Sequence, residues 1–281
     1  MSLLFSKPYF GPPATPYWGA PNSNANFCEE DYIVTSYIAE FVNTVTNISY
    51  VIYGAHGLSR LRGKPDGPLS FLGFPYWGLI GVGVLSAYFH ATLKYHSQMC
   101  DDTSMLVATG FVLNRAFTFD VAPTSRRNRS LGLLAILTAV TIYHCVADEI
   151  LVHVVTFGIM IVLVGIRTKQ LVHTRITDLD EKKRVKKLVN FGAANAGIGY
   201  LLWNIDQHLC PMLLSFRHKV GLPFGIFLEL HGWWHILTAI GAYTFMILVE
   251  HLTTDKTDRA EDFLWPLKGS LDVPKDQEKK N

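Results

Sequence analysis

The stretch HGWWHILTAIGAYTFMILVE, residues 231–250, places two histidines in an otherwise apolar run. On an α-helix residues four apart lie on one face, so His231 and His235 point the same way, one turn apart. Ionisable residues inside membrane helices are rare, costly and usually functional. The stretch therefore predicts a membrane-spanning helix whose two histidines can reach one ion.

The whole chain is too apolar for an ordinary soluble enzyme. Of its 281 residues 49% are hydrophobic and 17% charged, and the mean hydropathy is +0.21. A helix needs about 20 mostly apolar residues to cross a bilayer. Stretches of this kind are 34–58, 69–91, 100–119, 130–147, 149–167, 188–208 and 222–250. They predict an all-α polytopic membrane protein with seven transmembrane helices. Only Asp148 and Glu149 separate the fourth and fifth stretches, and a single interrupted helix there would leave six.

Lys and Arg are distributed unevenly between alternate loops. Loops 59–68, 120–129 and 167–187 contain three, three and eight of them, whereas the N-terminal 33 residues contain only Lys7. Because cytosolic loops are enriched in Lys and Arg, we expect a lumenal N-terminus and a cytosolic C-terminus. The expected organisation is a lumenal segment 1–33, a transmembrane domain 34–250 and a cytosolic tail 251–281.

Two further apolar segments hold polar residues. SAYFH places Ser86 one turn before His90, and MCDD includes Asp101. In the expected topology these residues converge with His231 and His235 toward the lumenal side. Three protein ligands plus water are typical of catalytic zinc sites, so His90 is the expected third ligand. Two simpler interpretations remain. Asp101 could face a helix dipole at a helix start, and Ser86 could ease helix packing.

These residues lie among sequence words that resemble the alkaline ceramidases. The words are TLKY at 92–95, WNID at 203–206, YIAEF at 37–41 and HGWWHILT at 231–238, and the resemblance extends from about residue 17 to residue 250. It implies a seven-helix intramembrane hydrolase that splits ceramide, dihydroceramide or phytoceramide into a sphingoid base and a free fatty acid. It also implies that His90, His231 and His235 bind zinc, that Ser86 and Asp101 assist the chemistry, and that Trp234 lines the cavity.

The resemblance further implies a calcium site near the lumenal end of the first helix. Its ligands would be Asn26, the Phe27 carbonyl, Glu29, Asp31 and Glu40. The chain departs from the family pattern here, because the first ligand is commonly Asp and the fourth Asn. Calcium accepts amide and carboxylate oxygens alike, so we expect the site to be kept. A second departure is Phe157, where some relatives have Tyr, so that a hydroxyl contact to substrate is absent from this part of the cavity.

Four cysteines are present, and Cys28 and Cys210 both lie outside the expected spans on the lumenal side. Lumenal cysteines can be oxidised. The family resemblance favours a bridge between these two, and free thiols are the alternative.

Amide hydrolysis needs a strong nucleophile, a stabilised oxyanion and a protonated leaving amine. A zinc-bound water can supply the nucleophile. We expect Asp101 to act as general base and then general acid, and Ser86 to help hold the oxyanion. Both ceramide chains would stay in lipid while the amide enters the helix bundle.

Two other functions fit part of the pattern. Progestin and adiponectin receptors also have seven helices and a three-histidine zinc site, but they place the N-terminus in the cytosol. A metal transporter would need polar groups strung across the bilayer, whereas those found here cluster at one depth.

The expected partners are membrane lipids. The basic run at 182–187 indicates an anchor against anionic lipid rather than nucleic acid, and no obligate protein partner is implied. Seven spans without a targeting peptide indicate the endoplasmic reticulum or Golgi membrane, and Lys279 with Lys280 offers a weak retrieval signal.

Overall fold

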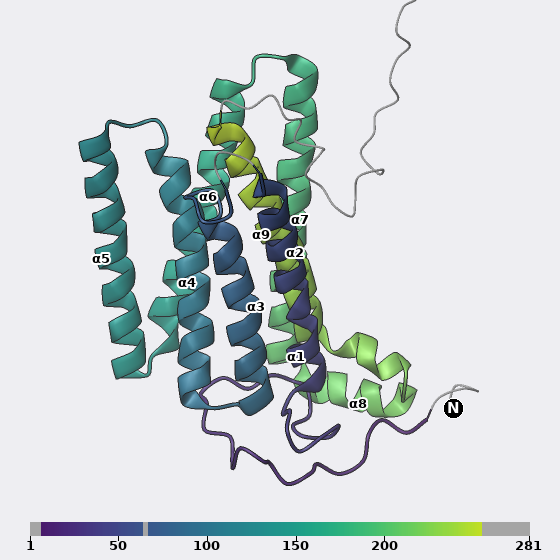
Figure 1. Cartoon of the computed structure of the whole chain (residues 1–281). Helices are drawn as coiled ribbons and strands as arrows, with labels where there is room; N and C mark the ends of the chain where they lie inside the picture. The colour runs from purple at the N-terminus through teal and green to yellow at the C-terminus, as the bar shows by residue number, and fades with distance from the viewer. Residues whose placement is uncertain (1–6, 64–66, 255–281) are drawn as a thin grey trace, which may run out of the picture.

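The computed structural model describes residues 7–63 and 67–254. Within these residues the chain is all-helical, as predicted, with two isolated β-bridges and no strand. The helices form a bundle in which the long ones run up and down beside one another (Figure 1). Their bounds are α1 (Phe41–Thr46), α2 (Ile48–Leu61), α3 (Phe74–Thr92), α4 (Tyr95–Thr118), α5 (Pro123–Ala147), α6 (Ile150–Arg175), α7 (Leu179–His208), α8 (Cys210–Val220), the 3₁₀ helix η1 (Phe224–Leu228) and α9 (Leu230–Thr253).

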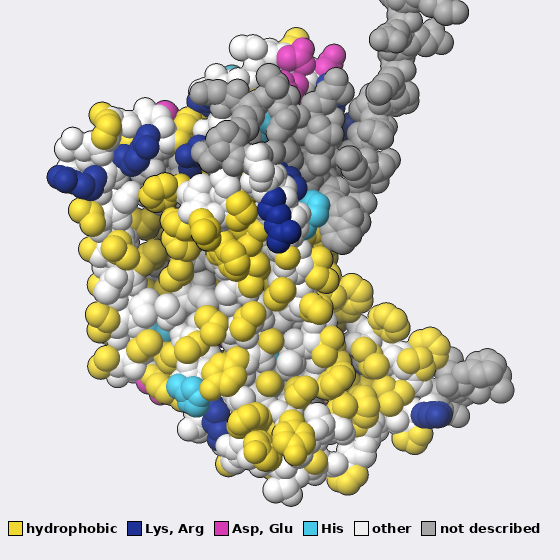
Figure 2. Space-filling model, in the orientation of Figure 1, with side chains coloured by type: hydrophobic (Ala, Val, Ile, Leu, Met, Phe, Trp, Pro, Cys, Tyr) yellow, Lys and Arg dark blue, Asp and Glu magenta, His cyan; other side chains and the backbone are white. Residues whose placement is uncertain are grey.

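Helix α9 lies at the centre of the bundle. It contacts α1, α2, α3, α4, α6 and α7, and its residues Ala239, Tyr243 and Ile247 are almost completely buried. Helix α5, by contrast, is peripheral, since His144 is its one buried residue. Apolar side chains cover the middle of the molecular surface (Figure 2). Three of the described helices, α5, α6 and α9, are long and apolar enough to cross a membrane.

The fourth and fifth predicted stretches form two helices, so the single interrupted helix is wrong. Asp148 adopts the left-handed conformation, with φ of 55°, directly after α5. The Glu149 carboxylate then accepts hydrogen bonds from the amides of Leu151 and Val152, at 2.6 and 3.0 Å. Because this cap satisfies amides in the first turn of α6, α6 starts as a separate helix.

The first predicted helix begins later than expected, at Phe41 rather than at residue 34. The amides of Ala39 and Glu40 donate to the carbonyls of Ala91 and His90, each at 3.0 Å, which holds this segment extended against the end of α3. The helix is also interrupted at Asn47, between α1 and α2.

The third predicted stretch, 100–119, forms α4, which begins earlier than expected, at Tyr95 rather than at residue 100. The hydroxyl of Ser97 accepts the Lys94 amide at 3.2 Å, a capping box that starts α4 one turn sooner. Asp101 therefore lies in the second turn of α4 and not at its first residue.

The last predicted stretch, 222–250, is helical in α9 only from Leu230. Residues before it form η1, which follows Pro223, and a proline cannot donate its amide within a helix. Helix α8 was not predicted at all. Helices α5, α6 and α7 are longer than expected, so that most of the basic residues assigned to loops 120–129 and 167–187 lie on helix ends. Lys64 and nearly all of the predicted tail, residues 255–281, lie outside the described residues.

Candidate active site

Three histidines meet where the end of α3 and the start of α9 come together, and these helix ends lie at the lower end of the bundle in Figure 1. His90 is in the last turn of α3, and His231 and His235 are in the first two turns of α9. The ring centroids lie 5.0 Å apart for His90 and His231, 4.8 Å for His90 and His235, and 4.5 Å for His231 and His235. One nitrogen from each ring lies within 4.8 Å of the other two, and all three residues are buried. The predicted convergence of these residues is present in the structure.

Polar neighbours orient two of the rings. His90 Nδ1 lies 2.5 Å from Glu40 Oε2, and His235 Nδ1 lies 3.0 Å from the Thr46 hydroxyl. Thr46 donates its one hydroxyl proton to the Val42 carbonyl at 2.8 Å, so it accepts from His235. Both Nδ1 atoms are therefore donors, which leaves the Nε2 lone pairs of both rings available. Metal-binding histidines are usually held in this way by a second group.

His231 differs from the other two because its ring is held by stacking. The ring of Phe27 lies 3.5 Å from it, centroid to centroid, with an interplanar angle of 27°. Its buried Nδ1 has no hydrogen-bond partner among the described residues. A buried polar atom without a partner is costly, and one nitrogen from each of the other two rings lies within 4.8 Å, so the donor set fits a metal ion.

Ser86 and Asp101 are buried beside the histidines. Ser86 lies one turn before His90 on α3, and its side chain interacts with the Asp101 carboxylate of α4. This contact joins the two residues predicted to assist catalysis. It also argues against the simpler interpretation of Asp101 as a helix-start residue.

The two predicted cavity residues pack against neighbouring aromatic rings. Trp234 lies between His231 and His235 in the sequence of α9 and packs against α7, where its ring centroid lies 6.4 Å from that of Trp203. Phe157 of α6 stacks in parallel with His153 at 6.4 Å.

The segment before α1 brings together the five residues predicted for calcium. The Asn26 amide donates to Asp31 at 3.3 Å, and the Phe27 amide donates to Glu40 at 3.0 Å. Glu29 is used differently from the prediction, because its two carboxylate oxygens accept the amides of Val42 and Asn43 at 2.6 and 2.8 Å and so cap α1. Burial, with the nearby charge of Glu40, raises the pKa of Asp31 to about 6, and one buried oxygen of Asp31 has no partner within residues 7–63 and 67–254. Glu29 has its pKa raised well above the usual range by burial and by Glu229 and Glu40. A cation bound here would offset the cost of keeping the Asp31 and Glu29 carboxylates charged while they are buried close to other carboxylates.

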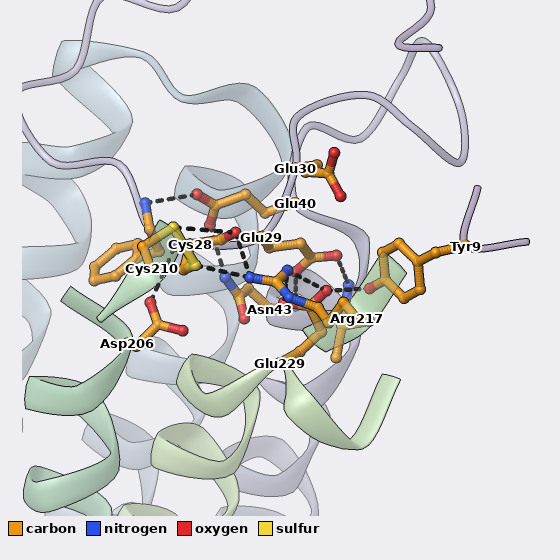
Figure 3. A network of polar contacts seen from close by, with 12 residues as sticks. Tyr9, Cys28, Glu29, Glu30, Glu40, Asn43, Asp206, Cys210, Arg217 and Glu229 are labelled. Carbon is orange, nitrogen blue, oxygen red and sulfur yellow. Dashed lines mark hydrogen bonds and ion pairs between the residues drawn. A yellow bond between two sulfur atoms is a disulfide. The ribbon is translucent and has the colours of Figure 1, made fainter. Parts of the chain in front are cut away.

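Figure 3 shows how this segment is tied to the rest of the fold. Cys28 and Cys210 form the predicted disulfide, and Cys100 and Cys145 are free. Asp206 of α7 accepts the Cys28 amide at 3.0 Å and lies near the backbone of His231. The aspartate of the WNID word therefore links the N-terminal segment to α7.

A fully buried arginine completes the network and was not predicted. Arg217 of α8 donates to both carboxylate oxygens of Glu229 at 2.6 Å and to the Cys28 carbonyl at 2.7 Å. Glu229 directly precedes α9 and accepts a hydrogen bond from Tyr9. The charge of Arg217 is thus matched by a carboxylate 12 positions away, a spacing that no sequence pattern marks.

Other buried polar residues also have partners within the fold. The Asn43 side-chain amide donates to Glu40, three positions earlier, at 2.9 Å and so helps to orient that carboxylate. His144, in the last turn of α5, and His153, near the start of α6, are buried, and His144 pairs with Asp102 at 2.9 Å rather than with the three histidines.

Comparison with known proteins places this site in a family. Residues 19–275 match the family described as Ceramidase. The chain belongs to the ceramidase family. It is 33% identical over 250 residues to alkaline ceramidase YPC1 of Saccharomyces cerevisiae, covering 84% of this chain and 78% of that protein. It is 33% identical over 229 residues to alkaline ceramidase 3 of Mus musculus, covering 81% and 82%. It is 26% identical over 262 residues to putative alkaline ceramidase dcd3B of Dictyostelium discoideum, covering 82% and 86%. The predicted family and enzyme class, a hydrolase of the alkaline ceramidase type, are confirmed.

Proposed function

We propose that this member of the ceramidase family is a zinc-dependent intramembrane amidase that hydrolyses the N-acyl bond of ceramides to a sphingoid base and a free fatty acid. The observation that supports it most is the set of three buried histidines, two of which have their Nδ1 atoms already engaged. Family membership favours this function over the receptor alternative.

His90, His231 and His235 would hold the metal. When bound there, zinc lowers the pKa of a water molecule toward about 7 and polarises the substrate carbonyl. Glu40 and Thr46 keep the rings of His90 and His235 in the tautomer that offers Nε2. Phe27 restricts rotation of the His231 ring.

Asp101 and Ser86 carry out the remaining steps. The Asp101 carboxylate accepts a proton from the attacking water and then delivers it to the amide nitrogen, which leaves as the sphingoid amine. The Ser86 hydroxyl donates a hydrogen bond to the carbonyl oxygen as negative charge develops on it. Because Ser86 interacts with Asp101 before substrate binds, the two side chains are already held beside each other.

We propose seven spans, formed by α1 with α2, then α3, α4, α5, α6, α7 and α9. The Lys and Arg side chains visible in Figure 2 gather mainly at the end of the bundle opposite the histidines. With basic residues in the cytosol, the histidines would lie toward the lumenal leaflet. Both ceramide chains could then remain in lipid while the amide reaches the site. The endoplasmic reticulum or Golgi membrane is the proposed location.

Calcium is the second proposed ion. Asn26, the Phe27 carbonyl, Asp31 and Glu40 would bind it, with Glu29 placed to contribute once it releases the amides that it caps. Glu40 would serve both ions, since its other oxygen contacts His90.

The proposed function is tested by incubating purified protein in detergent with a panel of ceramides. Release of free sphingoid base, detected by mass spectrometry, is expected from the wild type and not from a His231→Ala variant. Absence of release across ceramide, dihydroceramide and phytoceramide, from protein with its zinc bound, would contradict the proposal.

A further inference from the structure

Helix α8 and η1 form a hairpin that projects from the side of the bundle, and α8 runs across the direction of the long helices (Figure 1). The hairpin joins the end of α7 to the start of α9. It therefore connects two proposed spans at the end of the bundle that contains the histidines.

The two faces of α8 differ sharply. Leu209, Met212 and Phe216, spaced three or four residues apart, are 44–49% exposed. Leu213 and Arg217, on the inner face, are 6% and 0% exposed. Helical spacing of this kind produces one apolar outer stripe and one anchored inner stripe.

The 3₁₀ helix extends the apolar surface. Phe224 and Phe227 are 45% and 61% exposed. The Trp233 indole of α9 donates to the Phe227 carbonyl at 3.1 Å and is itself exposed. Tyr200 and Leu201 of α7 are also exposed, so helices on either side of the hairpin present apolar groups. Figure 2 shows hydrophobic side chains gathered over this corner of the molecule.

The inner face of the hairpin is fixed. Arg217 binds Glu229 and the Cys28 carbonyl, and Cys210 is in the disulfide with Cys28. The hairpin cannot turn its apolar stripe inward without breaking a buried ion pair. Five large apolar side chains held outward on so short a segment are the mark of a surface that meets lipid or another protein.

We propose that the hairpin, residues 209–228, is a membrane-surface platform whose apolar stripe inserts into the boundary between headgroups and acyl chains of the lumenal leaflet. The partner is lipid because the stripe adjoins the exposed apolar surfaces of two helices proposed to span the membrane. Lys219 lies over the Phe216 ring, 5.7 Å from its centroid, which suits a cation reaching toward headgroups from an apolar stripe. Through Arg217 the platform would set the depth of the histidine site in the leaflet. This inference rests on the proposed membrane orientation.

The test uses the full chain in phosphatidylcholine nanodiscs that hold one copy each, so that a second copy cannot cover the stripe. Single cysteines replace Met212, Phe216 or Phe227 in a Cys100→Ser, Cys145→Ser background, and each is given a nitroxide label. Collision of the label with oxygen, which concentrates in hydrocarbon, is compared with collision with a water-soluble nickel chelate. His218→Cys is the matched control on α8, because His218 is half-exposed and faces Glu30. Ile159→Cys on α6 is the control for a span.

The ratio of oxygen to nickel collisions is expected to be several-fold higher at positions 212, 216 and 227 than at 218. If the collision ratio at 212, 216 and 227 equals that at 218 while the label at 159 is in lipid, the proposed platform is wrong and the proposed spans stand. A label at 159 in water would overturn the proposed spans and the platform with them. Each labelled variant must keep the Cys28–Cys210 bridge on peptide mapping, and three independent reporters ensure that one misfolded variant does not decide the result.

Discussion

His90 Nδ1 lies 2.5 Å from Glu40 Oε2, although the two residues are 50 positions apart. The same carboxylate accepts the Phe27 amide and the Asn43 side-chain amide. One buried group therefore joins the N-terminal segment, α1 and a candidate zinc ligand.

Replacing Glu40 by Gln should weaken zinc binding. The amide cannot match the carboxylate in drawing the Nδ1 proton of His90, so Nε2 becomes a poorer ligand. Loss of such an outer partner typically costs about 10- to 100-fold in metal affinity. Competition with a zinc chelator measures the change. Thr46→Val removes the corresponding partner of His235 without changing charge and should act in the same direction, and unaltered competition curves for both variants would count against the proposed roles of these two residues.

Asp101→Asn keeps the size of the side chain but cannot accept a proton from water. We expect zinc to be retained while kcat falls by about 10² to 10⁴. Ser86→Ala should lower kcat less, because it removes one hydrogen bond to the oxyanion and leaves the proton acceptor in place. Steady-state release of sphingoid base gives both values. Near-normal turnover by Asp101→Asn would assign the proton transfer to another group.

Calcium should stabilise the fold by neutralising the crowded carboxylates before α1. Asp31→Asn is the sharpest variant, because Asp31 contacts Asn26, whereas Glu29 also caps a helix. We expect calcium to raise the melting temperature of the wild type over a titration from chelator to millimolar, and to raise that of Asp31→Asn less. Identical melting curves throughout the titration would show that no calcium binds there.

The buried pair of Arg217 and Glu229 should be costly to break. Among the described residues, Arg217→Met leaves the buried Glu229 carboxylate only the Tyr9 hydroxyl as a hydrogen-bond partner. Removal of one partner from such a pair costs about 3–5 kcal/mol of unfolding free energy. The double variant Arg217→Met, Glu229→Gln removes the unpaired charge and should recover part of the loss. Denaturant unfolding in detergent measures both. Equal stability of the single and double variants would show that the charge of Glu229 is not the cause.

The sequence predicted the histidine site because its signals are local. His231 with His235, and Ser86 with His90, are each four residues apart within apolar helices. The groups that orient them are distant in sequence, since Thr46 and His235 are 189 positions apart, and no pattern marks such a contact.

Several predicted helix boundaries were wrong for the same reason, because they depend on contacts between residues that are distant in sequence. The start of α1 depends on Glu29 and on carbonyls of α3. Helix α8 is short and amphipathic, begins beside a proline and lacks the apolar run by which the spans were found. In the sequence, Arg217 cannot be distinguished from a basic residue in an exposed loop. Only the folded structure places Glu229 beside it.

Zinc bound per chain, measured by inductively coupled plasma mass spectrometry on purified protein, tests the central claim most directly. We predict about one zinc per wild-type chain and per His96→Ala chain, since His96 contacts Tyr88 outside the site. We predict that zinc is lost, together with ceramide hydrolysis, from His90→Ala, His231→Ala and His235→Ala, while all three still insert into membranes. Stoichiometric zinc in all three variants, or wild-type protein that releases sphingoid base without any zinc, would contradict the account.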